Sequence, residues 1–180
     1  MKSKILIILL FFSLSFYAQE KFYTKSGTII FESSVASFEE VKATNNKVTA
    51  IFKPETGDIA ALALVKAFRF KIALMEEHFN ENYAESDKYP KAKFSGKIEN
   101  FNTEDLNKNE RVWIKGKLTF HGVTKEIRIP ANISKKNNSI LVSSSFSIKP
   151  EDFGIKIPKI VRKKIAKRVD VKLNFELNKK

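Results

Sequence analysis

The stretch "VDVKLNFEL", residues 169–177, alternates apolar and polar side chains along its whole length. Its odd-numbered residues are Val, Val, Leu, Phe and Leu, and its even-numbered residues are Asp, Lys, Asn and Glu. A repeat of two is the side-chain period of a β-strand that buries one face and exposes the other. The stretch therefore predicts a half-buried strand.

The same alternation recurs upstream, at residues 112–120, 127–133 and 140–148. His121-Gly122 lies between the first two of these segments and predicts a tight turn, so the pair should form a β-hairpin. Weaker strand candidates are residues 23–33, 47–53, 59–70 and 92–101. About eight strands separated by turn signals indicate an antiparallel barrel or sandwich rather than βαβ units. Two segments, 72–83 and 158–168, have helical patterns instead.

The first eighteen residues, "MKSKILIILLFFSLSFYA", have the features of a secretory signal. Lys2 and Lys4 precede an apolar run over residues 5–12 that is too short to span a bilayer, and cleavage is expected after Ala18. We therefore expect a signal peptide over 1–18, one domain over 19–180, and a periplasmic or secreted product. The chain has no cysteine, which excludes a disulfide framework and a cysteine nucleophile.

The net charge of +13 predicts attraction to anionic lipid head groups, phosphates or acidic polymers. Nucleic acid is not an expected partner, because no motif of a nucleic-acid module is present. Within the basic segment 156–168, apolar residues recur at helical spacing, which predicts a basic amphipathic helix or turn. It would contact an anionic membrane leaflet or a phosphate head group, or else form a solvated face. The candidate contacts are Lys156, Lys159, Arg162, Lys163, Lys164 and Lys167.

The helical segment 72–83 has an apolar row of Met75, Phe79 and Tyr83, with His78 and Asn82 along its edge. Its remaining polar residues, Glu76, Glu77, Asn80 and Glu81, are expected to face solvent. His78 acting as a general base is one alternative, but no nucleophile stands in an elbow motif.

The two histidines, His78 and His121, make no recognised metal-ligand spacing, so we expect neither a metal nor a catalytic set. At its turn, His121 should be structural, with its ring bonded to turn backbone. A place at the mouth of a pore beside His78 is the alternative.

Three blocks of sequence carry a resemblance to a known family. The blocks "LMEEHFNENYAESDKYPKAKFSGKI" (74–98), "GKLTFHGVTKEIRIP" (116–130) and "FSIKPEDFGIKIP" (146–158) resemble, in order and spacing, the signature blocks of the YceI-like family. The resemblance implies an exported, all-β, eight-stranded antiparallel lipocalin-like barrel with one or two short helices. It also implies a long internal pore that holds the isoprenoid chain of a polyprenyl lipid or quinone, and no shared catalytic residues.

The residues agree with this implication, because an eight-stranded barrel is either filled by side chains or able to hold one slender ligand. Small inward residues among the Phe and Ile favour a channel: Ala61, Ala63, Gly96, Gly116, Ala131 and Ser144. We therefore expect a carrier of an isoprenoid quinone or polyprenyl phosphate, with no other cofactor. The alternatives are an enzyme that uses His78 and a structural or adhesive module with a solid barrel. The sequence carries no signal for an oligomeric state.

The candidate residues of the channel wall and mouth are Phe68, Phe70, Met75, His78, Phe79, Asn82, Tyr83, Phe94, Ile114, Gly116, Leu118, Phe120, Phe146 and Phe153.

Overall fold

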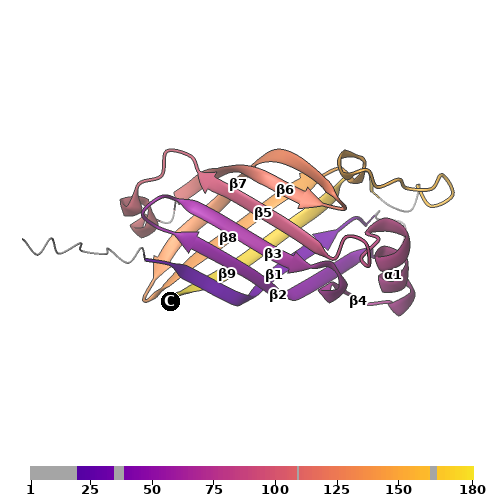
Figure 1. Ribbon diagram of the computed structural model, residues 1–180, viewed down its shortest axis with the longest axis horizontal. Helices are drawn as coiled ribbons and strands as arrows, with labels where there is room; N and C mark the ends of the chain where they lie inside the picture. Colours follow the sequence, from indigo (N-terminus) through magenta and orange to yellow (C-terminus); the bar gives the residue numbers. More distant parts are fainter. Residues whose placement is uncertain (1–19, 35–38, 109, 163–165) are drawn as a thin grey trace, which may run out of the picture.

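The computed structural model describes residues 20–34, 39–108, 110–162 and 166–180. In these ranges the chain forms one antiparallel sheet in the order β1-β9-β8-β7-β6-β5-β3-β2-β4, and β1 also pairs with β2. Eight strands thus close into a barrel, with the two-residue β4 beside β2 (Figure 1). The strands are β1 (Phe22–Glu32), β2 (Lys42–Lys53), β3 (Asp58–Leu64), β4 (Arg69–Phe70), β5 (Lys91–Ile98), β6 (Glu110–Phe120), β7 (Val123–Lys136), β8 (Ser139–Ile148) and β9 (Val169–Lys179).

The alternating stretch 169–177 forms most of β9, as its pattern predicted. Val171, Phe175 and Leu177 are buried inside the barrel, and the charged residues between them are exposed. Phe175 lies opposite Val142 of β8, and Leu177 lies opposite Ile140. Burial of one face fixes the register, because a shift by one residue would turn Asp170, Lys172 and Glu176 inward.

The predicted hairpin is also present. Phe120 pairs with Val123 across a two-residue turn, in which His121 and Gly122 have φ of 49° and 74°. Positive φ at both central positions is the requirement of a type I′ turn, whose twist matches that of the strands.

The helical segments have different outcomes. Residues 72–83 form α1 (Ala73–His78) followed by a π-helical turn, η2 (Phe79–Tyr83), as predicted.

The predicted strand 59–70 is divided into β3, a 3₁₀ turn η1 (Val65–Ala67) and β4. Two further 3₁₀ turns are η3 (Thr103–Asn107) and η4 (Pro150–Phe153). None of the helices in the described ranges is long and apolar enough to cross a membrane.

The prediction of a helix over 158–168 is wrong for the residues described. The N–H groups of Val161 and Arg162 both donate to the Pro158 carbonyl, which makes a single turn, and 166–168 are not helical. Lys163, Lys164 and Ile165 lie outside the described residues. β-Branched residues and a run of like charges both oppose extension of such a turn into a helix.

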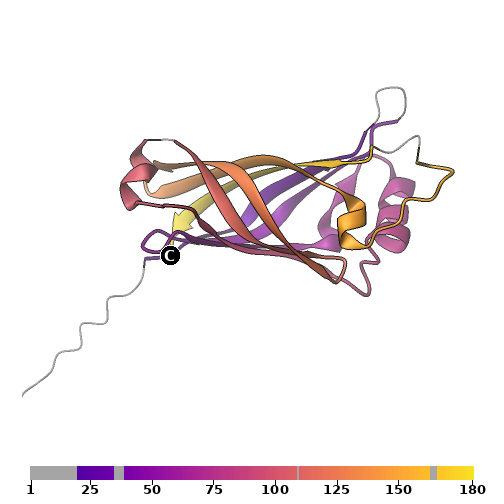
Figure 2. The same ribbon diagram turned by 90° about the horizontal axis from the view of Figure 1, so that it is seen from above.

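The two ends of the barrel differ. Five large side chains at the end near η3 and the β7–β8 turn are at most 1% exposed: Phe52, Ile98, Ile133, Ile140 and Leu177. Helix α1, η4 and the β6–β7 turn lie at the opposite end (Figure 2). Near this second end β7 separates from β8, since their pairing runs only between 131–136 and 139–144. Where the ladder stops, Ser144 Oγ donates to the Pro130 carbonyl at 2.6 Å.

Candidate functional site

A cavity of about 520 Å³ occupies the half of the barrel nearer α1. Its wall is almost entirely apolar, and the exposed residues Glu39 and His78 on its lining mark an opening at the α1 end. A solid barrel, the premise of the structural-module alternative, is therefore absent from this half. The structure brings together twelve of the predicted residues on the wall: Phe68, Phe70, Met75, His78, Phe79, Tyr83, Phe94, Ile114, Leu118, Phe120, Phe146 and Phe153.

An aromatic cluster lines the cavity below α1. The ring of Phe31 lies 5.2 Å from the ring of Phe68, 5.6 Å from that of Phe70 and 5.2 Å from that of Phe79, measured between centroids. Tilted and edge-on contacts at these distances are favourable for aromatic pairs. Phe31 was not predicted, although its place in β1, two residues after Ile29 on the same face, gives the necessary signal. The lining residues Glu39 and Val41 lie between β1 and β2, where no periodicity marks them.

Gly116 does not line the cavity, contrary to the prediction. It pairs directly with Gly96, and the ring of Phe94 covers both. A Cβ on Gly116 would lie 2.5 Å from the Ser95 carbonyl oxygen and 2.8 Å from Phe94 Cζ. The two glycines therefore let the Phe94 ring lie flat against the wall, which leaves the cavity open. A large residue at position 116 would disturb the pairing of β5 with β6 before it blocked the cavity.

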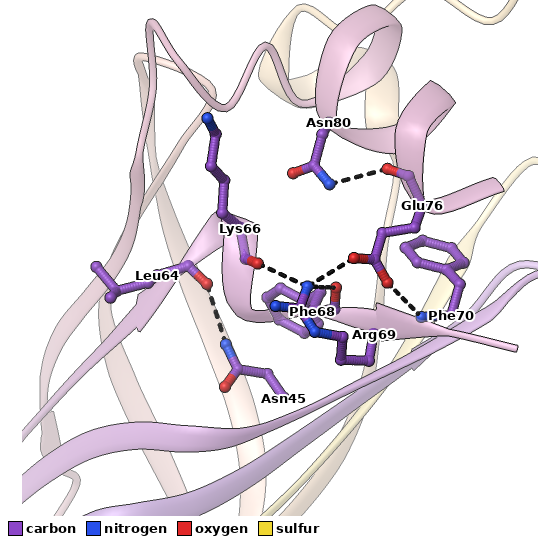
Figure 3. Close-up of polar contacts among 8 residues, drawn as sticks. All are labelled: Asn45, Leu64, Lys66, Phe68, Arg69, Phe70, Glu76 and Asn80. Carbon is purple, nitrogen blue, oxygen red and sulfur yellow. Dashed lines mark hydrogen bonds and ion pairs between the residues drawn. The ribbon is translucent and has the colours of Figure 1, made fainter. Parts of the chain in front are cut away.

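Polar contacts fasten α1 over the cavity (Figure 3). Glu76 accepts a hydrogen bond from Arg69 Nη1 at 2.6 Å and another from the backbone N–H of Phe70 at 3.1 Å. Asn80 Nδ2 donates to the Glu76 carbonyl at 2.8 Å. Glu76 and Asn80 are thus half-buried, not solvent-facing as expected, because Glu76 satisfies an edge-strand donor of β4. Glu77 is exposed, as expected.

The mouth has few polar side chains. His78 and Tyr83 line it from α1 and η2, and Glu39 lines it from the β1–β2 connection. Among the described residues, no carboxylate hydrogen-bonds to the His78 ring, so this imidazole lacks the oriented partner of a typical general base. Asn82 is exposed and does not lie on the wall.

His121 links three elements near the mouth. Its Nδ1 lies 3.0 Å from the carbonyl oxygen of Phe153 in η4, and its Nε2 lies 2.6 Å from Glu85 Oε2. The Phe153 carbonyl can only accept, so Nδ1 is the donor of that hydrogen bond. The Tyr89 and His121 rings pack edge to face, with centroids 4.7 Å apart. His121 is a structural connector with partners outside its own turn, and it does not line the cavity.

Residues 156–162 of the basic segment lie at the mouth. Ile157 and Val161 line the cavity, whereas Lys156, Lys159, Arg162 and Lys167 are exposed. The predicted contacts Lys163 and Lys164 lie outside the described residues. Within the ranges that the structure describes, no group of three or more His, Cys, Asp or Glu side chains is arranged to hold a metal ion.

Comparison with solved structures shows where this architecture recurs. The polyisoprenoid binding domain from Saccharophagus degradans superposes with a TM-score of 0.73 at 15% identity, covering 89% of this chain and 98% of that one. Burkholderia cenocepacia BcnA gives a TM-score of 0.68 at 16% identity, over 83% and 95% of the two chains. The YceI protein of Campylobacter jejuni gives 0.60 at 21% identity, over 79% and 86%. At these identities the likeness establishes the shared fold.

Comparison with curated proteins finds no significant relative. The family model of the YceI-like domain matches residues 21–177, which includes every strand of the barrel except the end of β9. The chain belongs to the YceI-like family.

Proposed function

We propose that this protein is an exported carrier that holds the long apolar tail of an isoprenoid lipid in its cavity, without chemistry. The observation that carries the proposal is the apolar cavity of about 520 Å³, open at one end of a closed barrel. This volume falls within the roughly 300–1,000 Å³ of typical ligand sites. The similarity to a domain described as polyisoprenoid-binding supports the same class of ligand.

The wall suits a long branched hydrocarbon. At about 0.8 kcal/mol per buried CH₂, each five-carbon isoprene unit contributes on the order of 3–4 kcal/mol before the costs of ordering. Phe31, Phe94 and Phe146 line the space with rings that need no hydrogen-bond partner. Such a wall discriminates methylene groups weakly, so selectivity falls to the tail length and the head group.

The head group is a quinone or a phosphate, and it remains at the mouth. Hydrogen-bonding side chains there, such as His78 and Tyr83, suit the carbonyl oxygens of a quinone, whereas the cations of the basic segment suit a polyprenyl phosphate. No cofactor beyond the lipid is proposed. The signal-like residues 1–18 support export to the periplasm or beyond the cell.

The test is recovery of the ligand. Native mass spectrometry and organic extraction of the purified protein should show a long-chain isoprenoid, and delipidated protein should take up either a quinone or a polyprenyl phosphate. Protein that is repeatedly recovered empty, and that binds neither lipid, contradicts the proposal.

The alternative enzyme would use His78 at the mouth as a general base. It requires that His78→Ala abolish turnover of a bound lipid while occupancy of the cavity survives. The carrier predicts no turnover with either form of the protein, and a product released only by the unsubstituted protein would favour the enzyme.

A further inference from the structure

The segment that crosses the mouth has two different sides. The turn that begins at Pro158 directs Ile157 and Val161 toward the cavity. Ile160 points the other way and is 87% exposed, more than any other large apolar side chain among the described residues. An isolated apolar side chain held this far into water has no role in the packing of the barrel.

Five exposed cations flank Ile160 along the chain, and together these six residues are called the basic rim: Lys156, Lys159, Ile160, Arg162, Lys167 and Arg168. Arg162 Nη2 donates to the Ile157 carbonyl and Arg168 Nη2 to the Ser147 carbonyl, so both guanidinium groups are held against backbone. No carboxylate within the described ranges forms an ion pair with any of the five. Their charge is therefore available to an external partner.

The α1 side of the mouth carries exposed carboxylates. Glu77 of α1 and Glu81 of η2 are exposed, whereas Asp87 is paired with Lys66. An anionic surface would be attracted to the basic rim and repelled by α1, so contact would be one-sided.

We infer that the basic rim docks the barrel on an anionic lipid bilayer, with Ile160 inserted among the acyl chains and the mouth facing the membrane at a tilt. An apolar residue flanked by cations is the combination that binds membrane interfaces, through apolar burial and attraction to anionic lipid. Docking of this kind places Ile157 and Val161 between the acyl chains and the cavity, where a lipid tail must pass. The inference rests on the proposed function, since a bilayer is the source or destination of the lipid.

The first test is flotation of the protein with vesicles of phosphatidylcholine, with or without phosphatidylglycerol. The variant Lys156→Gln/Lys159→Gln/Arg162→Gln should bind the anionic vesicles about 100-fold more weakly, because each cation near such a surface contributes about fivefold. The matched control Lys93→Gln/Lys97→Gln/Lys117→Gln removes the same charge from the outer wall of β5 and β6 and should bind normally. Equal loss in both variants, or equal binding to neutral vesicles, overturns the inference.

The second test locates the contact. The chain has no cysteine, so Ile160→Cys gives a single site for an environment-sensitive dye. Its emission should shift to the blue on anionic vesicles and be shielded from an aqueous quencher, whereas a dye on Asn138→Cys, in the β7–β8 turn at the far end, should not change. A dye at 160 that stays in water while the protein binds overturns the insertion. Tighter binding to heparin than to vesicles assigns the rim to an acidic polymer instead.

A control separates this inference from the proposed function. Both rim variants should still take up an uncharged quinone, as native mass spectrometry would show, because none of the substituted residues lines the wall and such a head group carries no charge for the cations to hold. Loss of docking with the lipid retained tests the rim alone. Variants that dock normally but never contain lipid would contradict the proposed carrier function without affecting the inference that the rim docks on a bilayer.

Discussion

The two halves of this barrel are built from the same strands, but one half is filled by side chains and the other encloses a cavity. Near η3, large side chains such as Phe52, Ile133 and Leu177 meet across the axis and are almost fully buried. Near α1, the inward rings of Phe31, Phe94 and Phe146 remain half-exposed to an internal cavity. Both halves follow the same alternation of apolar and polar residues. The difference shows that the pattern determines which face is inside, whereas the size and placement of the residues determine whether the inside is full.

Truncation of one ring in each half gives the largest expected effect. Phe52→Ala should lower the free energy of unfolding by about 3–5 kcal/mol, because it leaves a void in packed surroundings. Phe146→Ala should cost only about 1–2 kcal/mol in the lipid-free protein, since this ring already faces open space. Chemical denaturation of both variants measures the two losses in free energy of unfolding. Equal losses would contradict the difference in packing between the two halves.

Gly116→Ala tests what keeps the hollow half open. A methyl group at this position meets the Ser95 carbonyl at 2.5 Å, so strand pairing must shift, and we expect a loss of about 2 kcal/mol. Lys117→Ala, on the outer face of the same strand, serves as the control and should cost much less. If Gly116→Ala unfolds at the same denaturant concentration as the control, the space left by the two glycines is not needed to accommodate the Phe94 ring.

Filling the cavity should weaken lipid binding more than it weakens the fold. Ala61 lines the cavity and its neighbour Ala60 faces solvent, so Ala61→Phe and Ala60→Phe form a matched pair. We expect the first to lower affinity for an isoprenoid about tenfold or more, the equivalent of about 1.4 kcal/mol, and the second to leave it unchanged. Titration of delipidated protein with a quinone measures both. The same affinity for the two variants would show that the tail binds elsewhere.

The smallest effect is expected on the outer wall near the packed half. Hydrogen bonds from Arg128 hold the pKa of Glu99 below its ordinary value of 4.5. A carboxylate with a lowered folded-state pKa stabilises the fold above the ordinary value, and this contribution is lost as the pH falls through the lowered one. Glu99→Gln should therefore be slightly less stable than the unsubstituted protein at neutral pH, and the difference should close in acid. Denaturation at several pH values checks this, and a constant difference would rule out the ion pair as its cause.

Much of the fold could be predicted because its signals are local. The alternation at 169–177 and the His121-Gly122 pair depend on side-chain period and on backbone φ, and both predictions were confirmed. Of the helix or turn expected within 156–168, the described residues form only the turn, so the helix over 158–168 was wrong for them. Spacing alone ignores the repulsion among the cations and the bulk of the β-branched residues. The prediction for Gly116 failed for another reason, since only the register of β5 against β6 reveals that Gly96 and Phe94 occupy its space.

The candidate site was predictable to the extent that it follows the apolar face of each strand. Phe94, Leu118 and Phe146 were found in this way. Glu39 and Val41 could not be found, because a loop has no period, and the clamp made by Glu76 depends on a β4 donor that no sequence pattern marks.

The early end of the β7–β8 ladder gives the barrel wall a seam. Beyond Pro130 and Ser144 the β7–β8 ladder has ended, and His121 of the β6–β7 turn contacts the Phe153 carbonyl of η4. Parting the wall along this line therefore breaks no β7–β8 backbone ladder, unlike parting it anywhere that paired strands run side by side. In amide hydrogen exchange, we expect residues 123–129 to lose protection earlier than residues 131–136 of the same strand. Widening of the wall along this line would make room for a branched tail that enters at the mouth.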